Sequence, residues 1–81
     1  MTPPILGRVM LFAGDFVPKG WSLADGRSLP KAQNHALYAV LQGRFGEDSE
    51  AFQLPDLRGT EPAPGLVWCI AVQGRFPSRG G

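Results

Sequence analysis

The chain has 81 residues, so it forms one domain at most, and a domain of this size buries only about 60 to 65% of the surface that its unfolded chain exposes. Glycine and proline contribute 11 and 8 residues while 43% of the chain is hydrophobic, which indicates a globular, turn-rich domain with little stability of its own. The net charge is +1 and the basic residues form no run, which argues against nucleic acid as a partner.

The first third of the chain predicts two short strands joined by a turn. Residues 1–6 are expected to form a loose lead-in, because two consecutive prolines favour polyproline geometry. Residues 9–13 are apolar on both faces and precede a glycine, which is typical of a buried strand. Residues 18–20 fit a type II turn. The alternation that follows places Trp21 and Leu23 on the buried face of a second strand, and we expect Trp21 to be the largest contributor to the core.

One helix is predicted, over residues 32–42, after a tight turn at Asp25-Gly26. Gly43 then stands where the end of a helix accepts left-handed geometry. Residues 46–50 are acidic and are interpreted as a solvated loop, with a site for a hard cation as the alternative. The apolar stripe of the helix is formed by Gln33, Leu37, Val40 and Leu41.

Residues 52–59 are interpreted as the segment around which the fold is organised. Pro55 fixes its own φ and keeps the residue before it out of a helix, while Gly59 permits a positive φ, so the segment is stiff and extended. Asp56 and Arg58 are two residues apart and share one side of an extended chain, so we expect them to act as a polar clamp. The expected partners of this clamp are the backbone and two earlier residues, Asp25 and Arg27. The apolar anchors are Phe52, Leu54 and Leu57.

Short motifs within residues 7–59 are similar to those of one known family. In chain order they are Met10-Leu11-Phe12-Ala13-Gly14, Pro18-Lys19-Gly20-Trp21, Asp25-Gly26, Leu29-Pro30, Gln33-Asn34 with Leu37, and Phe52-Gln53-Leu54-Pro55-Asp56-Leu57-Arg58-Gly59. In this order and spacing they resemble the phage tail collar domain family, which includes tail-fibre and microcystin-dependent proteins. The resemblance implies a structural or adsorption role in the tail of a phage or phage-derived particle, made in the host bacterial cytoplasm. The structural motif residues it implies are Trp21, Asp25, Gly26, Phe52, Leu54, Pro55, Asp56, Leu57, Arg58 and Gly59.

The resemblance also implies a layout from which a variable region is missing. We expect a single domain over residues 1–81: the lead-in, collar motifs over 7–59, a proline-rich connector over 60–65, and a returning strand and tail over 66–79. Many relatives carry a long variable region before such a tail, which here follows the connector directly. If that region recognises a surface receptor in larger relatives, its absence here argues against direct receptor binding by this chain. The sequence Gln-Gly-Arg-Phe occurs twice, at 42–45 and 73–76, and coincidence is favoured over duplication.

The residue types argue against catalysis, a cofactor or a metal. His35 and Cys69 are the only histidine and cysteine, so one chain offers no zinc cluster, and the alternative is three copies of His35 on a threefold axis. Cys69 lies in an apolar run and is interpreted as a buried, unreactive thiol. Asp25 and Asp56 could be the two carboxylates of a glycoside hydrolase, but a nearby arginine beside each favours turn caps and salt bridges. The glycines stand singly, so no phosphate loop is predicted.

The last apolar stretch, residues 66–72, is too short for the roughly 18 residues that span a bilayer, and no basic region opens the chain. We therefore expect neither membrane insertion nor a signal peptide. Because the stretch is apolar on two faces, it predicts a buried strand beside residues 9–13. The predicted fold class is α+β, with a small, mainly antiparallel β-sheet and one α-helix packed on it.

This last strand also predicts self-association. One of its faces carries Leu66, Trp68, Ile70 and Val72, and the other carries Val67, Cys69 and Ala71. A small sheet and one short helix can hardly cover both faces, so apolar surface is left over. The interface candidates are Trp68, Ile70 and Val72, and the resemblance to fibre proteins implies a trimer. The leading hypothesis is a non-catalytic structural part of a phage tail fibre or tail tip, bound to other tail proteins. The alternatives are a small glycan- or cell-surface-binding module and, third, a hydrolase.

Overall fold

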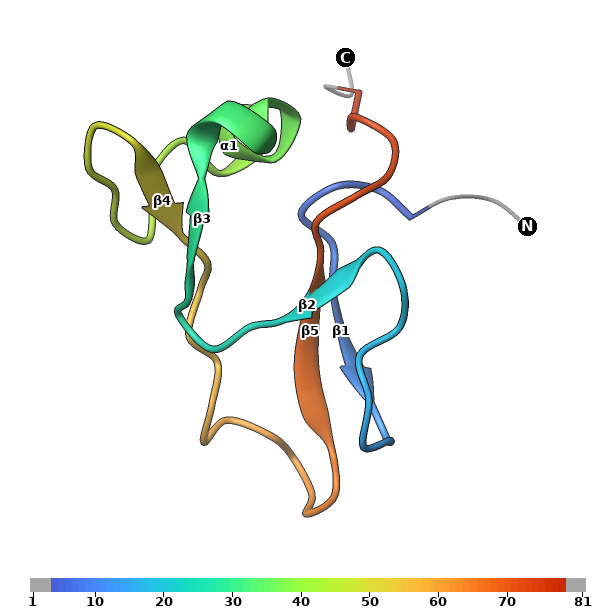
Figure 1. Cartoon of the computed structure of the whole chain (residues 1–81). Coiled ribbons are helices and arrows are strands. Elements are labelled where there is room, and N and C mark those ends of the chain that lie inside the picture. Colours follow the sequence, from blue (N-terminus) through green and yellow to red (C-terminus); the bar gives the residue numbers. More distant parts are fainter. Residues whose placement is uncertain (1–3, 79–81) are drawn as a thin grey trace.

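The computed structural model describes residues 4–78, and the predicted α+β class is confirmed. In chain order the elements are β1 (Val9–Phe12), β2 (Trp21–Leu23), β3 (Ser28–Pro30), the 3-10 helix η1 (Lys31–Gln33), α1 (His35–Leu41), β4 (Ala51–Gln53) and β5 (Val67–Ala71) (Figure 1). The strands pair antiparallel in two sheets where one was expected, a three-stranded sheet in the order β1-β5-β2 and a two-stranded sheet β3-β4. The predictions for residues 1–3 and for Arg79 lie outside the described residues.

β5 is the central strand of the larger sheet. It pairs with β1, where Val9 lies opposite Ile70, so the predicted pairing of the last strand with residues 9–13 is confirmed. On its other edge it pairs with β2, where Trp21 lies opposite Ala71. A central strand is flanked by a strand on both edges, and this position fits the continuous apolar run of β5.

The core lies on one face of this sheet, against α1 and the β3-β4 sheet. Its largest fully buried side chains include Phe52 from β4, Leu37 from α1 and Ile70 from β5. Trp21 is only half-buried, so the prediction that it contributes most to the core is wrong. The pairing register explains the error: Ser22, and not Trp21, lies opposite Ile70 and shares its face of the sheet.

The helical region is shorter than predicted. Residues 31–33 form the single turn η1, and α1 begins only at His35, after Asn34, whose side chain makes no capping hydrogen bond to the helix. At the other end Gln42 already has φ 56, so the left-handed conformation starts one residue before Gly43, the predicted stop. Because η1 interrupts the helical period, the predicted stripe is divided between buried Leu37 and Leu41, half-buried Val40 and exposed Gln33.

The central motif lies extended along residues 24–27. Asp25 forms an isolated antiparallel bridge with Asp56. The amide of Gly26 donates to the carbonyl of Pro55 at 3.2 Å, and the amide of Leu57 donates to a carbonyl of the facing segment at 2.8 Å. Pro55 has no amide to donate, and this ladder uses only its carbonyl. The motif therefore continues the β3-β4 pairing toward the larger sheet.

The N-terminal segment and the C-terminal tail pair with each other. The amide of Leu6 donates to the carbonyl of Arg75 at 2.9 Å, and the amide of Arg75 donates to the carbonyl of Pro4 at 2.8 Å. Gly74 is needed for this approach, because a side chain there would collide with the Pro4 carbonyl. The 60–65 connector lies at the end of the molecule opposite α1 (Figure 1). Within residues 4–78 no helix has the length and apolar character to cross a bilayer.

Candidate functional site

The three-stranded sheet has two faces with different surroundings. Side chains alternate between faces along a strand, and directly paired residues share a face. The register therefore places Val9, Trp68 and Ile70 toward the core, and all three belong to the core cluster or pack against it. The opposite face, which we call the open sheet face, carries apolar side chains throughout: Met10, Phe12, Trp21, Leu23, Val67, Cys69 and Ala71.

The open sheet face lies outside the main core cluster. None of its residues belongs to the core cluster or to the half-buried residues packed against that cluster. Its two small central residues, Cys69 and Ala71, have no exposed surface, whereas its five larger residues are half-buried. Burial raises the pKa of the Cys69 thiol, so the thiol stays protonated and poorly nucleophilic near neutral pH. This face therefore offers apolar contact area and no reactive group.

The loop between β1 and β2 lies against this face. In Figure 1 it runs on the side of β5 away from β3 and β4. Its Phe16 is 64% exposed and meets Phe12 edge-on, with ring centroids 5.4 Å apart. The loop encloses a hollow of about 170 Å³ together with Leu23 and Val67. A second hollow, of about 180 Å³, borders the same two residues on the side of Asp25. Packing between the loop and the sheet is therefore incomplete.

The predicted interface residues lie on the other side of the sheet. Ile70 is 0% exposed and has no surface to offer a partner, so its choice as an interface candidate is corrected. Trp68 and Val72 are half-buried and pack against the core cluster. The strand pattern separated the two sets of residues in 66–72 but carried no signal for which set faces the core, because both sets are apolar. Ser22 is the one polar residue of β2, and the alternation of β2 therefore predicted that Trp21 and Leu23 face the core. Ser22 faces the core instead, and its hydroxyl donates to the Leu23 carbonyl at 3.2 Å.

Two aspartate–arginine pairs of the same geometry face each other across the central motif. Arg58 donates from Nε and Nη2 to the two carboxylate oxygens of Asp56 at 2.9 and 2.7 Å. Arg27 binds Asp25 in the same way, with both distances 3.0 Å. Each aspartate thus pairs with the arginine two residues on, and within residues 4–78 no hydrogen bond links one pair to the other. The expected bonds from Asp56 and Arg58 to the side chains of the other pair are therefore not formed.

The charges of these pairs shift the pKa values of their carboxyl groups. The hydrogen bonds from Arg58 lower the pKa of Asp56 to about 2, and those from Arg27 lower the pKa of Asp25. Both carboxylates stay ionised at neutral pH. A general acid for glycoside hydrolysis needs a raised pKa, so the arrangement suits ion pairing better than proton transfer.

The remaining motif residues serve the backbone and the core. Phe52, Leu54 and Pro55 are buried, and Leu57 packs against the core cluster. Gly26 has φ 81, and a Cβ on it would lie 3.2 Å from the Cβ of Asp56, so the close approach of the two aspartate-bearing segments requires glycine. The other glycine of the motif, Gly59, also has a positive φ, 87, with open space around it.

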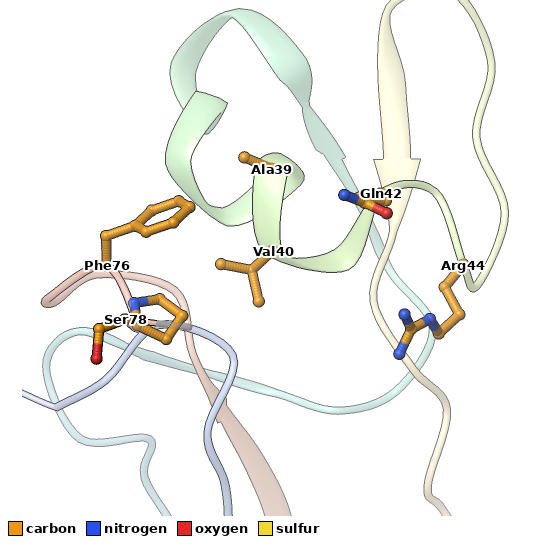
Figure 2. Close-up of a pocket in the computed structure, with 7 residues that line it drawn as sticks. Ala39, Val40, Gln42, Arg44, Phe76 and Ser78 are labelled. Atoms are coloured by element: carbon orange, nitrogen blue, oxygen red, sulfur yellow. The ribbon is translucent and has the colours of Figure 1, made fainter. Parts of the chain in front are cut away.

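A separate hollow of about 250 Å³ lies between the C-terminal end of α1 and the tail. Val40 and Phe76 flank it on one side and Arg44 reaches toward it from the loop after the helix (Figure 2). The phenyl ring of Phe76 is 58% exposed. The two Gln-Gly-Arg-Phe segments meet here, because the first supplies Gln42 and Arg44 and the second supplies Phe76. The repeat in the sequence carried no signal that its two copies would meet.

The residue types that bind metal ions do not gather in this structure. Among residues 4–78 no group of three or more histidine, cysteine, aspartate or glutamate side chains is placed to hold an ion. His35 is exposed at the first residue of α1. In the acidic loop the carboxylate of Asp48 accepts the amides of Glu50 and Ala51, both at 2.8 Å, which closes the turn before β4.

Comparison with known proteins gives two findings. The model of the Phage Tail Collar Domain family matches residues 7–62. Over 45 residues the chain is 47% identical to Protein RhiB of Rhizobium leguminosarum bv. viciae, an alignment that covers 51% of this chain and 20% of RhiB. The chain therefore spans about a fifth of the length of this relative.

Proposed function

Since this chain belongs to the phage tail collar domain family, we propose that it is a structural, non-catalytic subunit of a phage tail fibre or of the tip of a phage-derived tail. We further propose that it assembles as a trimer and binds other tail proteins in the particle. The observation that carries self-association is the open sheet face, an apolar surface that the core does not use.

The chemistry of the open sheet face supports a protein partner. Its half-buried residues include two aromatic rings, and Phe16 projects beside them. Each 100 Å² of apolar surface removed from water contributes about 2.5 kcal/mol before the costs of ordering and association are subtracted. The second hollow is also lined by three charged residues, Asp25, Arg58 and Glu61, which supply part of the polar rim that such interfaces have.

A second copy of the chain is the partner that we propose for this face. A cyclic trimer uses two different patches of each copy, one for each neighbour. Phe16 provides an exposed ring, and the second hollow, beside Leu23 and Val67, provides an apolar recess for the corresponding ring of the next copy. The threefold number rests on the resemblance of the family to fibre proteins.

The non-catalytic role is supported by the state of the acidic side chains. The two aspartates that a hydrolase would need are each held by an arginine that lowers their pKa. The alternative function, a small surface-binding module, is favoured by one observation, the hollow beside Phe76.

The test of self-association is the mass of the protein in solution. We expect sedimentation equilibrium at moderate salt to give three times the 8.7 kDa of one chain. Phe16→Ser should shift the mass toward that of the monomer, because it removes the exposed ring from the loop. Phe76→Ser removes a ring of similar exposure at the other end of the molecule and serves as the matched control. A folded wild-type monomer at every concentration would refute self-association, and a stable dimer would refute the trimer alone.

A further inference from the structure

The hollow between α1 and the tail has the composition of a small ligand site. We propose that it binds an acidic sugar unit, a pyranose ring that carries a carboxylate, as found in bacterial surface polysaccharides. The proposal goes beyond the structural role and concerns a region distinct from the open sheet face. Its wall is formed by Ala39, Val40, Gln42, Arg44, Phe76 and Ser78 (Figure 2).

Arg44 supplies the positive charge. Three ion pairs occur within residues 4–78, and they employ Arg27, Lys31 and Arg58. The guanidinium of Arg44 makes neither an ion pair nor a hydrogen bond among these described residues, and the residue is exposed. A guanidinium presents its donors in a planar fork that matches the two oxygens of a carboxylate. The side chain can therefore bind an external carboxylate without breaking an internal contact.

Phe76 and Val40 supply the apolar surface. Figure 2 shows both side chains beside the space between the helix and the tail. One face of a pyranose ring consists of C–H groups, which are apolar and weakly positive, and the face of a phenyl ring is negative. An exposed phenyl ring in a recess is therefore suited to stack on a sugar. Inorganic phosphate would use Arg44 but leave this apolar wall uncovered.

The remaining wall supplies polar groups at the rim. The side-chain amide of Gln42 and the hydroxyl of Ser78 make no hydrogen bond within residues 4–78, and they can pair with the hydroxyl groups of a sugar. The volume of about 250 Å³ is just below the roughly 300 to 1,000 Å³ of pockets that enclose drug-sized ligands. The hollow therefore suits one ring of a polysaccharide, with its neighbours in solvent.

A site this shallow binds weakly when it acts alone. Several copies on one assembly convert weak sites into firm attachment, because each binding event after the first is intramolecular. The site thus gives a structural subunit a second use, contact with an acidic polysaccharide, while the open sheet face holds the copies together. Loss of self-association should leave the affinity of each single site unchanged, because the two surfaces share no residue.

The test is a titration of the ¹⁵N-labelled full chain, followed by amide and arginine Nε–H resonances. Sodium glucuronate is the probe, with glucose and inorganic phosphate as the neutral and the non-sugar comparison. We expect glucuronate to shift the resonances of Arg44 and Phe76 and to bind at least tenfold more tightly than glucose. Equal binding of glucose and glucuronate, or phosphate binding as tightly as glucuronate without a shift at Phe76, would overturn the proposal. Tighter binding of acetyl-glycine, a peptide-like carboxylate, would overturn it as well.

Two variants and two controls separate the site from general effects. Arg44→Gln should remove the preference for glucuronate over glucose, and Phe76→Ser should weaken binding of both sugars at least fivefold. Arg8→Gln and Phe16→Ser change an exposed arginine and an exposed phenylalanine outside the hollow, and binding should be unchanged in both. Wild-type binding in Arg44→Gln, with native resonances elsewhere, would show that the proposal is wrong.

Discussion

At Asp25 and Asp56 the same three-residue geometry occurs twice on facing segments. In each, an extended backbone places an arginine on the same side as an aspartate two residues earlier, and glycine at position 26 lets the two segments approach. The pair at Asp56 is exposed, with side-chain exposures of 69% for the arginine and 47% for the aspartate. Water screens such a pair, so its loss should cost less stability at neutral pH than the loss of a buried pair would. The predicted polar clamp is therefore an exposed ion pair.

The pH dependence of stability provides the first prediction. The folded pKa of Asp56 is about 2, below the value of about 3.9 in an unfolded chain. The stabilising contribution is therefore complete above about pH 4 and is lost as the pH falls toward 2. Asp56→Asn should flatten the fall in urea midpoint between these pH values, and Glu50→Gln is the control, since its carboxylate makes no ion pair within residues 4–78. An unchanged slope in Asp56→Asn would rule out this linkage.

At the scale of elements, one polar cluster joins η1, α1 and the loop before β4. The hydroxyl of Tyr38 donates to Glu47 at 2.5 Å, and the ammonium of Lys31 lies 2.9 Å from the same carboxylate oxygen. The ammonium also lies 4.7 Å from the centroid of the Tyr38 ring, a cation–π geometry. The helix is also anchored by Leu37 and Leu41 in the core. A helix of two turns gains little from propensity, so these contacts hold it in place.

The second prediction concerns the titration of this cluster. Tyr38 is the only tyrosine, so its ionisation can be followed by absorbance near 295 nm. The hydrogen bond to Glu47 favours the protonated phenol and raises the pKa of Tyr38 above its ordinary value of 10.0. The associated stability is present below pH 10 and is lost as the pH rises through the folded pKa. Glu47→Gln should lower the titration midpoint, and Glu50→Gln should not. A midpoint that Glu47→Gln leaves unchanged would contradict this hydrogen bond.

At the scale of the whole molecule, a small core is combined with an apolar face that the core leaves uncovered. The core uses one face of the larger sheet and is completed by α1 and β4, with Phe52 at 0% exposure. The other face is covered in part by the loop that carries Phe16. A domain of this length has little stability to spare, so burial of that face against a second copy would add to the stability of the fold.

The third prediction follows from mass action. If association through the open sheet face is coupled to folding, the melting temperature should rise as the protein concentration increases, because only folded chains associate. Met10→Gln should lower the melting temperature at high concentration and reduce its concentration dependence, since the side chain lies on that face. Arg44→Gln is the control, on the far side of the molecule. A sharp transition with a melting temperature independent of concentration would show that folding does not depend on association.

The fold class, the pairing of the last strand with the first, and the family could all be predicted from the amino-acid sequence. These follow from local signals: apolar runs of strand length, turn residues between them, and motifs at fixed spacing in residues 7–59. The extended conformation of the central segment 52–59 could also be predicted, because proline fixes its own φ and glycine permits a positive φ wherever they occur. The salt bridge of each aspartate with its nearby arginine was also predicted. The expected bonding from one pair to the other was not formed, because it depends on how the facing segments are arranged.

The tertiary structure alone decided which surface is available for function. Alternation along β5 divides its residues into two apolar sets, and the pattern is the same whichever set faces the core. That choice was made by the register with β2, which puts Ser22 opposite Ile70 and leaves Trp21 on the open sheet face. The hollow beside Phe76 was equally hidden, because Arg44 and Phe76 are distant in sequence and meet only when the tail folds back onto α1. Periodicity is a property of one segment, whereas a face or a hollow is a property of several.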